Sequence, residues 1–201
     1  MMKKEIISML KISWPIMAII LAIVVIIRVA YIKNHKKKVS LLNEIMLLLF
    51  VAYILILFQL VTYENNGFNG VNLVPFKEIL RYKIGSDAFI KQVVGNIVLF
   101  IPFGFFITYY ANIKNIGSAF FTTVAASIVI ETVQYFIGRS FDIDDIILNV
   151  VGGIIGFLLF VALDAIKKHL PALFQKDIIY VILSILLLVF ILLNIFGVIS
   201  F

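Results

Sequence analysis

Polar and ionisable side chains gather at two places in a chain that is otherwise strongly hydrophobic. The first place begins with an Asn-x-x-Pro-Phe run, and the second joins Glu-x-x-Gln to an Arg and a cluster of Asp residues. Charge beside hydrocarbon is energetically expensive and tends to mark a functional site. The predicted binding residues are Asn72, Pro75, Phe76, Asn96, Glu131, Gln134, Arg139, Asp142, Asp144, Asp145 and Asn149.

The second place holds four acids and one base, and one arginine cannot neutralise four carboxylates. The surplus acids could hold a divalent cation, because calcium and magnesium prefer oxygen ligands. They could instead pair with Lys77, Arg81 or Lys91 of the preceding loop. The third alternative is that Asp142 to Asp145 cap and charge the start of the helix that follows, where acids favour the helix dipole. Capping does not explain Glu131, which lies within the preceding hydrophobic run.

Several kinds of chemistry are excluded by residue type. The chain has no cysteine, which rules out disulfides, zinc–thiolate sites and thiol nucleophiles. His35 and His169 each lie among lysines in hydrophilic loops. No Ser/His/Asp set can therefore be assembled at membrane depth, and no cofactor is predicted.

The composition is that of a membrane protein. Hydrophobic residues make up 63% of the chain and charged residues 14%, with a mean hydropathy of +1.15, whereas soluble domains are about 45–50% apolar and about 25% charged. The net charge is +6, but the lysines flank hydrophobic spans and form no basic face on a soluble domain. Nucleic-acid binding is therefore not expected.

The hydropathy pattern predicts an all-α fold, a polytopic membrane bundle of about six transmembrane helices, since a span needs about 20 apolar residues. The whole chain, residues 1–201, is expected to form a single membrane domain. A short interfacial or re-entrant helix is expected between helices two and three. The predicted spans are 12–32, 41–62, 93–110, 119–137, 146–163 and 178–198.

Three of these spans carry features that bear on packing. Ser127, Glu131 and Gln134 are spaced by four and three residues and so share one stripe. In the fifth span, Gly152 and Gly156 form a small-xxx-small surface that lets a neighbouring helix approach. In the third span, the Pro-Phe-Gly run at 102–104 predicts a kink.

The loop between the second and third spans is unusually apolar. From Pro75, which can open a helix, Phe76 and Leu80 fall on one face, and Lys77 and Arg81 fall on the other. This pattern favours an interfacial amphipathic segment, although a surface loop packed on the helix ends is the alternative.

Basic residues in the other loops set the expected sidedness. Lysines at 33–38, at 114 and at 167–176 place those loops in the cytoplasm by the positive-inside rule. Loops 63–92 and 138–145 are then extracellular, so both polar runs face outward. Cations at 3–11 and 77–91 oppose this assignment.

The ordered set of motifs from residue 72 to residue 160 resembles the VanZ-like membrane protein family. The motifs are Asn72-x-x-Pro75-Phe76, Gly95-Asn96, Phe100-x-Pro102-Phe103-Gly104, Glu131-x-x-Gln134, Arg139, Asp142-x-Asp144-Asp145, Asn149 and Gly152-Gly153-x-x-Gly156. The resemblance implies a VanZ-like core over 72–160, with extra helices at 12–32 and 178–198. It also implies a role at the outer face of a Gram-positive membrane, in resistance to the lipoglycopeptide teicoplanin.

Three functions are compatible with these residues. The favoured one is a non-enzymatic protein that binds or shields an envelope lipid or peptidoglycan precursor. Its expected partners are membrane lipids, together with a peptidoglycan precursor or the lipoglycopeptide itself. The alternative is a membrane enzyme acting on a lipid-linked substrate, using Glu131 and the aspartates at 142–145. A small transporter is the third, but the chain shows no inverted repeat. The oligomeric state is not indicated by the sequence.

Overall fold

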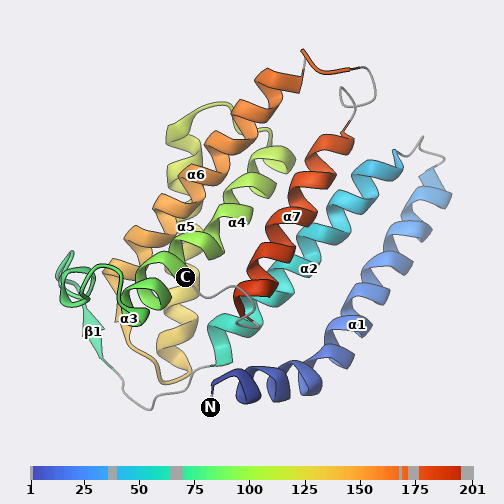
Figure 1. The fold of residues 1–201 in the computed structure, drawn as a ribbon. Helices are drawn as coiled ribbons and strands as arrows, with labels where there is room; N and C mark the ends of the chain where they lie inside the picture. Colours follow the sequence, from blue (N-terminus) through green and yellow to red (C-terminus); the bar gives the residue numbers. More distant parts are fainter. Residues whose placement is uncertain (1, 36–39, 64–69, 168, 172–176, 196–201) are drawn as a thin grey trace. The chain divides into compact units, whose positions relative to one another are not determined.

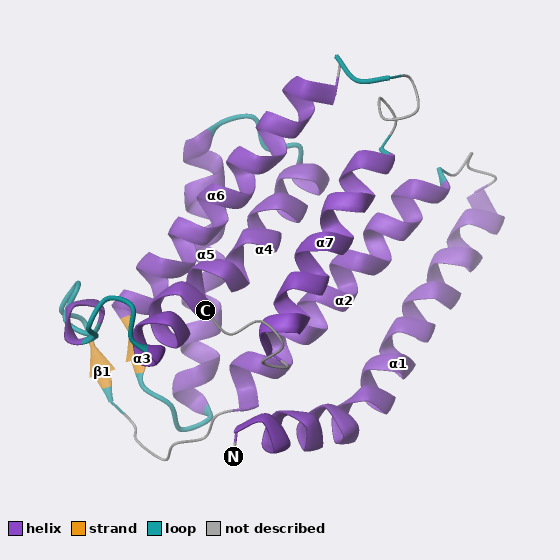
Figure 2. Ribbon diagram, in the orientation of Figure 1, coloured by secondary structure: helices purple, strands orange, loops and turns teal. Residues whose placement is uncertain are grey.

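The computed structural model describes residues 2–35, 40–63, 70–167, 169–171 and 177–195, and in these ranges it is almost entirely helical (Figures 1 and 2). The long helices are α1 (Met2–His35), α2 (Leu41–Tyr63), α4 (Gly95–Ala111), α5 (Ile116–Phe136), α6 (Ile143–Lys167) and α7 (Ile178–Ile195). Shorter elements are β1 (Val71–Asn72), η1 (Ile79–Arg81), α3 (Asp87–Phe89), η2 (Ile90–Val94) and β2 (Phe141–Asp142). The all-α class is therefore confirmed.

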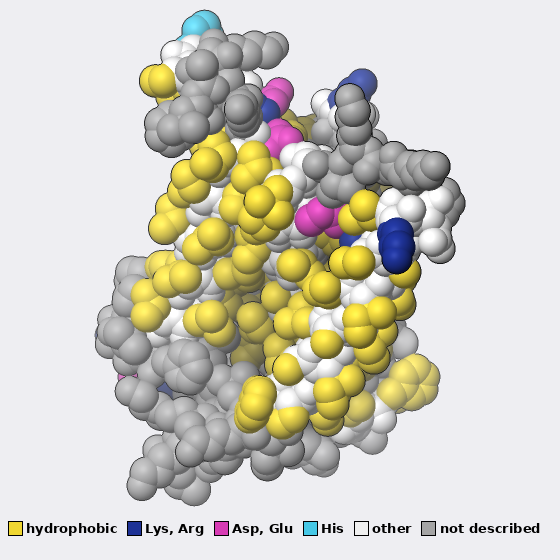
Figure 3. All heavy atoms as spheres, turned by 90° about the vertical axis from the view of Figure 1, so that its right-hand side faces the viewer, with side chains coloured by type: hydrophobic (Ala, Val, Ile, Leu, Met, Phe, Trp, Pro, Cys, Tyr) yellow, Lys and Arg dark blue, Asp and Glu magenta, His cyan; other side chains and the backbone are white. Residues whose placement is uncertain are grey.

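Within the described residues, five helical segments are long and apolar enough to cross a membrane: 13–34, 41–62, 87–111, 116–136 and 143–167. The apolar stretch of α7, residues 178–193, is shorter. Such segments expose large apolar side chains, and α1 is the least buried of the five, with none of its apolar window buried. On the face drawn in Figure 3, hydrophobic side chains cover most of the described surface. This is the surface expected of helices that contact lipid.

The chain divides by packing into two compact units, residues 1–59 with 166–200 and residues 60–165. We call the second the α4–α6 unit, and it contains every predicted binding residue. This division does not test the prediction of a single membrane domain. In the first unit, Arg28 of α1 pairs with Glu44 of α2 at 2.8 Å, and Ser184 of α7 donates to Met46 of α2 at 3.3 Å.

Glycines bring the three long helices of the α4–α6 unit together. A Cβ added at Gly156 or Gly152 of α6 would collide with the backbone of α4, and one at Gly153 would collide with Thr123 of α5. Gly104 of α4 lies against the backbone of Gly153 in the same way. The small-residue surface predicted on this helix is thus a packing surface, which lets backbones approach closely where lipid gives no hydrophobic drive.

The ends of these helices are set by polar residues. The Asn115 side chain accepts from Ser118 N at 2.8 Å and caps the start of α5. Asn112 adopts a left-handed conformation (φ 51°) and ends α4. At the other end of the unit, Ser86 caps the start of α3 by accepting from Phe89 N.

Local structure differs from the sequence expectation at three points. The first helix begins at Met2, ten residues before the predicted start. The third span begins at Asp87 and passes through a π-helical turn, η2, before α4. Helix α4 is continuous through Pro102, so the kink expected there stays a prediction, and Gly104 serves close packing. The short helix expected near residues 76–83 is a single 3-10 turn, η1.

Candidate functional site

Two loops that are distant in sequence are joined at one end of the α4–α6 unit by a short parallel pairing of β1 with β2. Val71 pairs with Phe141 and Asn72 pairs with Asp142. The side chains continue the contact, because the Asn72 amide donates to the Asp142 carboxylate at 2.9 Å. Figure 2 shows the strands in orange. The pairing fixes the loop before α3 onto the loop before α6.

Asp144 holds the same two loops together from inside. Its carboxylate accepts from the backbone N–H groups of Phe76 (2.5 Å), Glu78 (2.7 Å) and Ile79 (3.2 Å). The side chain is 1% exposed. Phe76 has a φ of 65°, a left-handed conformation that is costly for a residue with a bulky side chain. The three bonds to one carboxylate help to hold the turn in this conformation.

Of the residues 142–145 expected to cap and charge the start of α6, Asp142 is the one whose side chain caps it, whereas the Asp144 carboxylate binds the loop of residues 76–79. The Asp142 carboxylate accepts from Asp144 N at 2.8 Å, at the first turn of α6, as an N-cap side chain does. Asp144 faces the loop of residues 76–79, because the parallel strand pairing brings that loop beside the start of α6.

A second network runs from Glu131 to Arg139. Glu131 of α5 is 1% exposed and accepts from Asp142 N at 3.0 Å. With the Gln134 amide oriented to satisfy both neighbours, its nitrogen donates to Glu131 at 2.8 Å and its oxygen accepts from Arg139 Nη1 at 2.8 Å. The same Nη1 donates to the carbonyl of Val61 at 3.1 Å. The stripe predicted on α5 is thus buried and linked to both loops.

The two remaining predicted amides form separate contacts. The Asn96 amide of α4 donates to Asp145 of α6 at 2.6 Å. The Asn149 amide of α6 donates to the Ser127 hydroxyl of α5 at 2.9 Å, where both groups are buried. Each contact satisfies polar groups between helices, so α4, α5 and α6 are bridged in pairs near the loop end of the unit.

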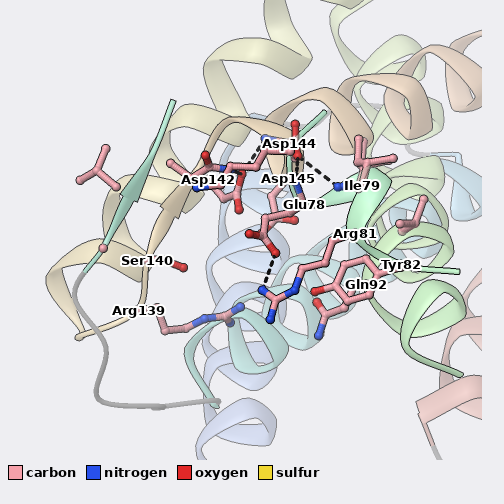
Figure 4. A pocket seen from close by; sticks show the side chains of 16 residues that line it. Glu78, Ile79, Arg81, Tyr82, Gln92, Arg139, Ser140, Asp142, Asp144 and Asp145 are labelled. Carbon is pink, nitrogen blue, oxygen red and sulfur yellow. Dashed lines mark hydrogen bonds and ion pairs between the residues drawn. The ribbon is translucent and has the colours of Figure 1, made fainter. Parts of the chain in front are cut away.

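A cavity of about 430 Å³ lies between the two loops and the adjoining helix ends. In Figure 4 the guanidinium groups of Arg81 and Arg139 extend into it near Glu78 and Tyr82. The lining residues are Gly70, Val71, Asn72, Lys77, Glu78, Ile79, Arg81, Tyr82, Gln92, Val93, Arg139, Ser140, Asp142, Asp144, Asp145 and Leu148.

The cavity is lined by only part of the predicted binding set. The predicted residues in its wall are Asn72, Arg139, Asp142, Asp144 and Asp145. The other predicted residues do not line the cavity: Pro75, Phe76, Asn96, Glu131, Gln134 and Asn149. All of these except Pro75 make hydrogen bonds that support the cavity wall or the helices behind it.

Several lining residues had not been predicted to bind. The polar residues that also line the cavity are Glu78, Tyr82, Gln92 and Ser140. In the sequence they look like ordinary polar residues of a surface loop. For Glu78 and Tyr82, the apolar character of their loop is a signal that its polar residues face a common interior, whereas no such signal marks Gln92 or Ser140.

Burial changes the ionisation of the groups in this wall that lie outside the membrane spans. Burial raises the pKa of the Asp142 carboxyl, whereas the bond from Asp144 N lowers it. The nearby carboxylates of Asp144 and Glu78 raise it further. Burial also raises the pKa of the Tyr82 hydroxyl. Tyr82 therefore stays a hydrogen-bond donor near neutral pH.

The acids do not converge as metal ligands. Within the described ranges, no group of three or more Asp, Glu or His side chains has a metal-binding arrangement. The carboxylates of Glu131, Asp142 and Asp144 accept instead from backbone N–H groups. The predicted pairing of Arg81 with the later acids is also not found, since Arg81 pairs with Glu78 at 3.1 Å.

Comparison with known proteins places the whole site inside one family. A family model described as VanZ/LLP1 matches residues 44–164. The chain belongs to the VanZ/LLP1 family. Protein VanZ of Enterococcus faecium is 32% identical over 148 residues, which cover 69% of this chain and 81% of the relative. No solved structure matches the chain.

The VanZ/LLP1 match extends further than the motifs suggested. It begins within α2 and ends near the end of α6, whereas the motifs that resemble the family cover 72–160. Both loops of the cavity, the helices α4 and α5, and all but the last three residues of α6 lie in the matched range. The apolar spans 41–62, 87–111 and 116–136 lie almost wholly in this range as well.

Proposed function

We propose that this protein lowers the susceptibility of a Gram-positive envelope to lipoglycopeptides such as teicoplanin. It does so by binding or shielding an envelope lipid or a peptidoglycan precursor in the cavity of the α4–α6 unit. The family and the apolar helices support a membrane protein with this role. Binding, without catalysis, is the mechanism that the cavity supports best.

This proposal rests on which polar groups of the cavity are hydrogen-bonded within the protein and which donors face the cavity. The carboxylates of Asp142 and Asp144 are engaged by N–H donors of the wall itself. Arg139 directs one nitrogen, Nη1, to the wall, and a guanidinium offers five N–H donors. Together with Lys77 and Arg81, it presents cationic donors to the cavity. Such donors suit the phosphate or carboxylate of a precursor.

The enzyme alternative requires a carboxylate that is free to exchange a proton with a substrate. Glu131 accepts from Asp142 N and from Gln134, and it does not line the cavity. These contacts favour a supporting role. Incubating the purified protein with a lipid-linked precursor, with and without Mg²⁺, and following its mass would test the alternative directly. A product that appears only with the parent protein, and not with Glu131→Gln, would favour the enzyme.

The proposal places the cavity on the extracellular side. The chain has no cysteine, so single-cysteine labelling is unambiguous. Ser140→Cys, in the exposed wall of the cavity, should react with a membrane-impermeant maleimide in intact cells. Lys114→Cys, in the loop between α4 and α5, should react only after the cells are opened. The reverse pattern would place the cavity in the cytoplasm and end the proposal.

Drug susceptibility of a Gram-positive host expressing the chain tests the function itself. The parent should raise the inhibitory concentration of teicoplanin, and the Lys77→Ala/Arg81→Ala variant should lose that effect. Lys33→Ala/Lys114→Ala removes two exposed cations outside the cavity and is the charge-matched control. Membrane abundance is measured by immunoblot in every strain. Equal protection by parent and cavity variant at equal abundance would overturn the proposal.

A further inference from the structure

The loop that forms one wall of the cavity turns its apolar side chains outward. We call residues 71–84 the apolar loop. Leu80 is 81% exposed and Ile84 is 83% exposed, and Leu73, Val74 and Phe76 are each more than half exposed. A cluster of large exposed apolar side chains on one segment marks an interaction surface.

The apolar loop is held in this orientation by its other face. Strand pairing with β2 and the Asn72–Asp142 bond fix its beginning. The Asp144 carboxylate then holds the backbone N–H groups of Glu78 and Ile79. Because the polar backbone is satisfied inward, the outward position of the apolar side chains is part of the fold.

The position of the apolar loop along the chain identifies what covers it. The apolar span 87–111 begins three residues after Ile84, so the loop lies at a membrane surface. Its exposed cations are Lys77, Arg81 and Lys83. Apolar side chains interleaved with cations are typical of segments that insert into an anionic lipid interface.

We propose that the apolar loop inserts into the bilayer interface, and that the cavity behind it takes a phosphate-bearing lipid laterally from the headgroup layer. Lys77 and Arg81 belong both to the loop and to the cavity wall. Their charges therefore lie where lipid phosphates lie, while Leu80 and Ile84 lie deeper. The second half of this inference rests on the proposed function, because it takes the cavity to be the ligand site.

Insertion is tested by placing a polarity-sensitive bimane probe on Leu80→Cys, in vesicles of equal parts phosphatidylcholine and phosphatidylglycerol. Brominated lipid should quench this probe severalfold more strongly than iodide in the aqueous phase does. The same probe on Lys114→Cys, in an exposed polar loop, should show the opposite preference. A Leu80 probe that is quenched by iodide and not by brominated lipid would overturn the inference.

Lipid capture is tested by native mass spectrometry of the protein released from the same membranes. The parent should retain phosphatidylglycerol, the Lys77→Ala/Arg81→Ala variant should retain severalfold less, and the Lys33→Ala/Lys114→Ala control should match the parent. Equal retention by all three would overturn the lateral capture.

The failure of this inference and the failure of the proposed function give different results. If the probe at Leu80 stays in water but the cavity variants still lose teicoplanin protection, the inference alone is wrong. If the probe is inserted in the membrane but the cavity variants keep full protection, the proposed function is wrong and the insertion of the apolar loop still holds.

Discussion

The carboxylate of Asp144, at the start of α6, accepts a hydrogen bond at 2.7 Å from the backbone N–H of Glu78, 66 residues earlier in the chain. One buried side chain thus fixes the turn that carries Lys77 and Arg81 into the cavity wall. The arrangement makes the shape of the candidate site depend on a residue whose polar atoms point into the protein.

Replacing Asp144 should therefore destabilise the protein strongly. Asp144→Ala leaves three backbone N–H groups without their acceptor, and such losses cost about 2–4 kcal/mol when the groups are buried. Asp144→Asn keeps one acceptor oxygen and should lie between this variant and the parent. Asp87→Ala, at an exposed acid in α3, controls for loss of one charge. Thermal unfolding in detergent measures the effect, and equal melting of the Asp144→Ala and Asp87→Ala proteins would contradict it.

The glycine surface of α6 gives a second prediction. A Cβ at Gly156 would overlap the backbone of Ile101 and Phe105 in α4, which cannot rotate away. Gly156→Ala should cost about 1–3 kcal/mol through forced backbone shifts. Gly95→Ala is the matched control, because its Cβ would meet Ile90 O at an ordinary 3.7 Å. If the two alanine variants unfold at the same temperature, α4 and α6 are not packed as closely as described.

The helical part of this architecture could be predicted from the sequence because it depends on local periodicity. Ser127, Glu131 and Gln134 were expected on one stripe, and all three are buried. The packing role of Gly152 and Gly156 followed from their spacing in the same way.

The loop part could not be predicted, because its partners are set by contacts between distant residues. A pairing of two residues in each strand leaves no alternating pattern to detect. Asp144 looked like a helix cap because acids at helix starts usually are caps, and only the strand pairing shows that it faces residues 76–79. The same pairing decides that Tyr82 and Ser140 line one cavity.

The pH dependence of the free energy of unfolding should reveal the raised pKa of the Asp142 carboxyl. Burial raises its pKa above the ordinary 3.8. The folded protein then holds this proton more tightly than the unfolded chain, so its contribution to stability falls as pH rises from 3.8 through the raised pKa. Asp142→Asn keeps an acceptor for Asp144 N but cannot titrate. The free energy of unfolding of the parent minus that of Asp142→Asn should decline over that pH range and then level off. A difference that grows with pH would show that the pKa of Asp142 is not raised in the folded protein.

Glu131→Gln should impair function more than folding. The buried carboxylate provides acceptors for two donors, Asp142 N and the Gln134 amide. A glutamine has one acceptor oxygen, so one donor must turn away. The amide of Gln134 can do so by reversing its oxygen and nitrogen, but its nitrogen then faces Arg139. Two donors cannot pair, and Arg139 loses one of the contacts that position it in the cavity wall.

The expected result for Glu131→Gln is a protein that still folds, with its free energy of unfolding lowered by about 1–3 kcal/mol, but that no longer protects cells from teicoplanin. Exchanging the two groups provides the decisive control. In Glu131→Gln/Gln134→Glu, the residue at 131 can accept from Asp142 N and donate to the new carboxylate, which in turn accepts from Arg139. Net charge and the positioning of Arg139 are restored, so protection should return. If the single variant protects as well as the parent at equal membrane abundance, or if the exchange fails to rescue a folded protein, Glu131 does not act by positioning Arg139.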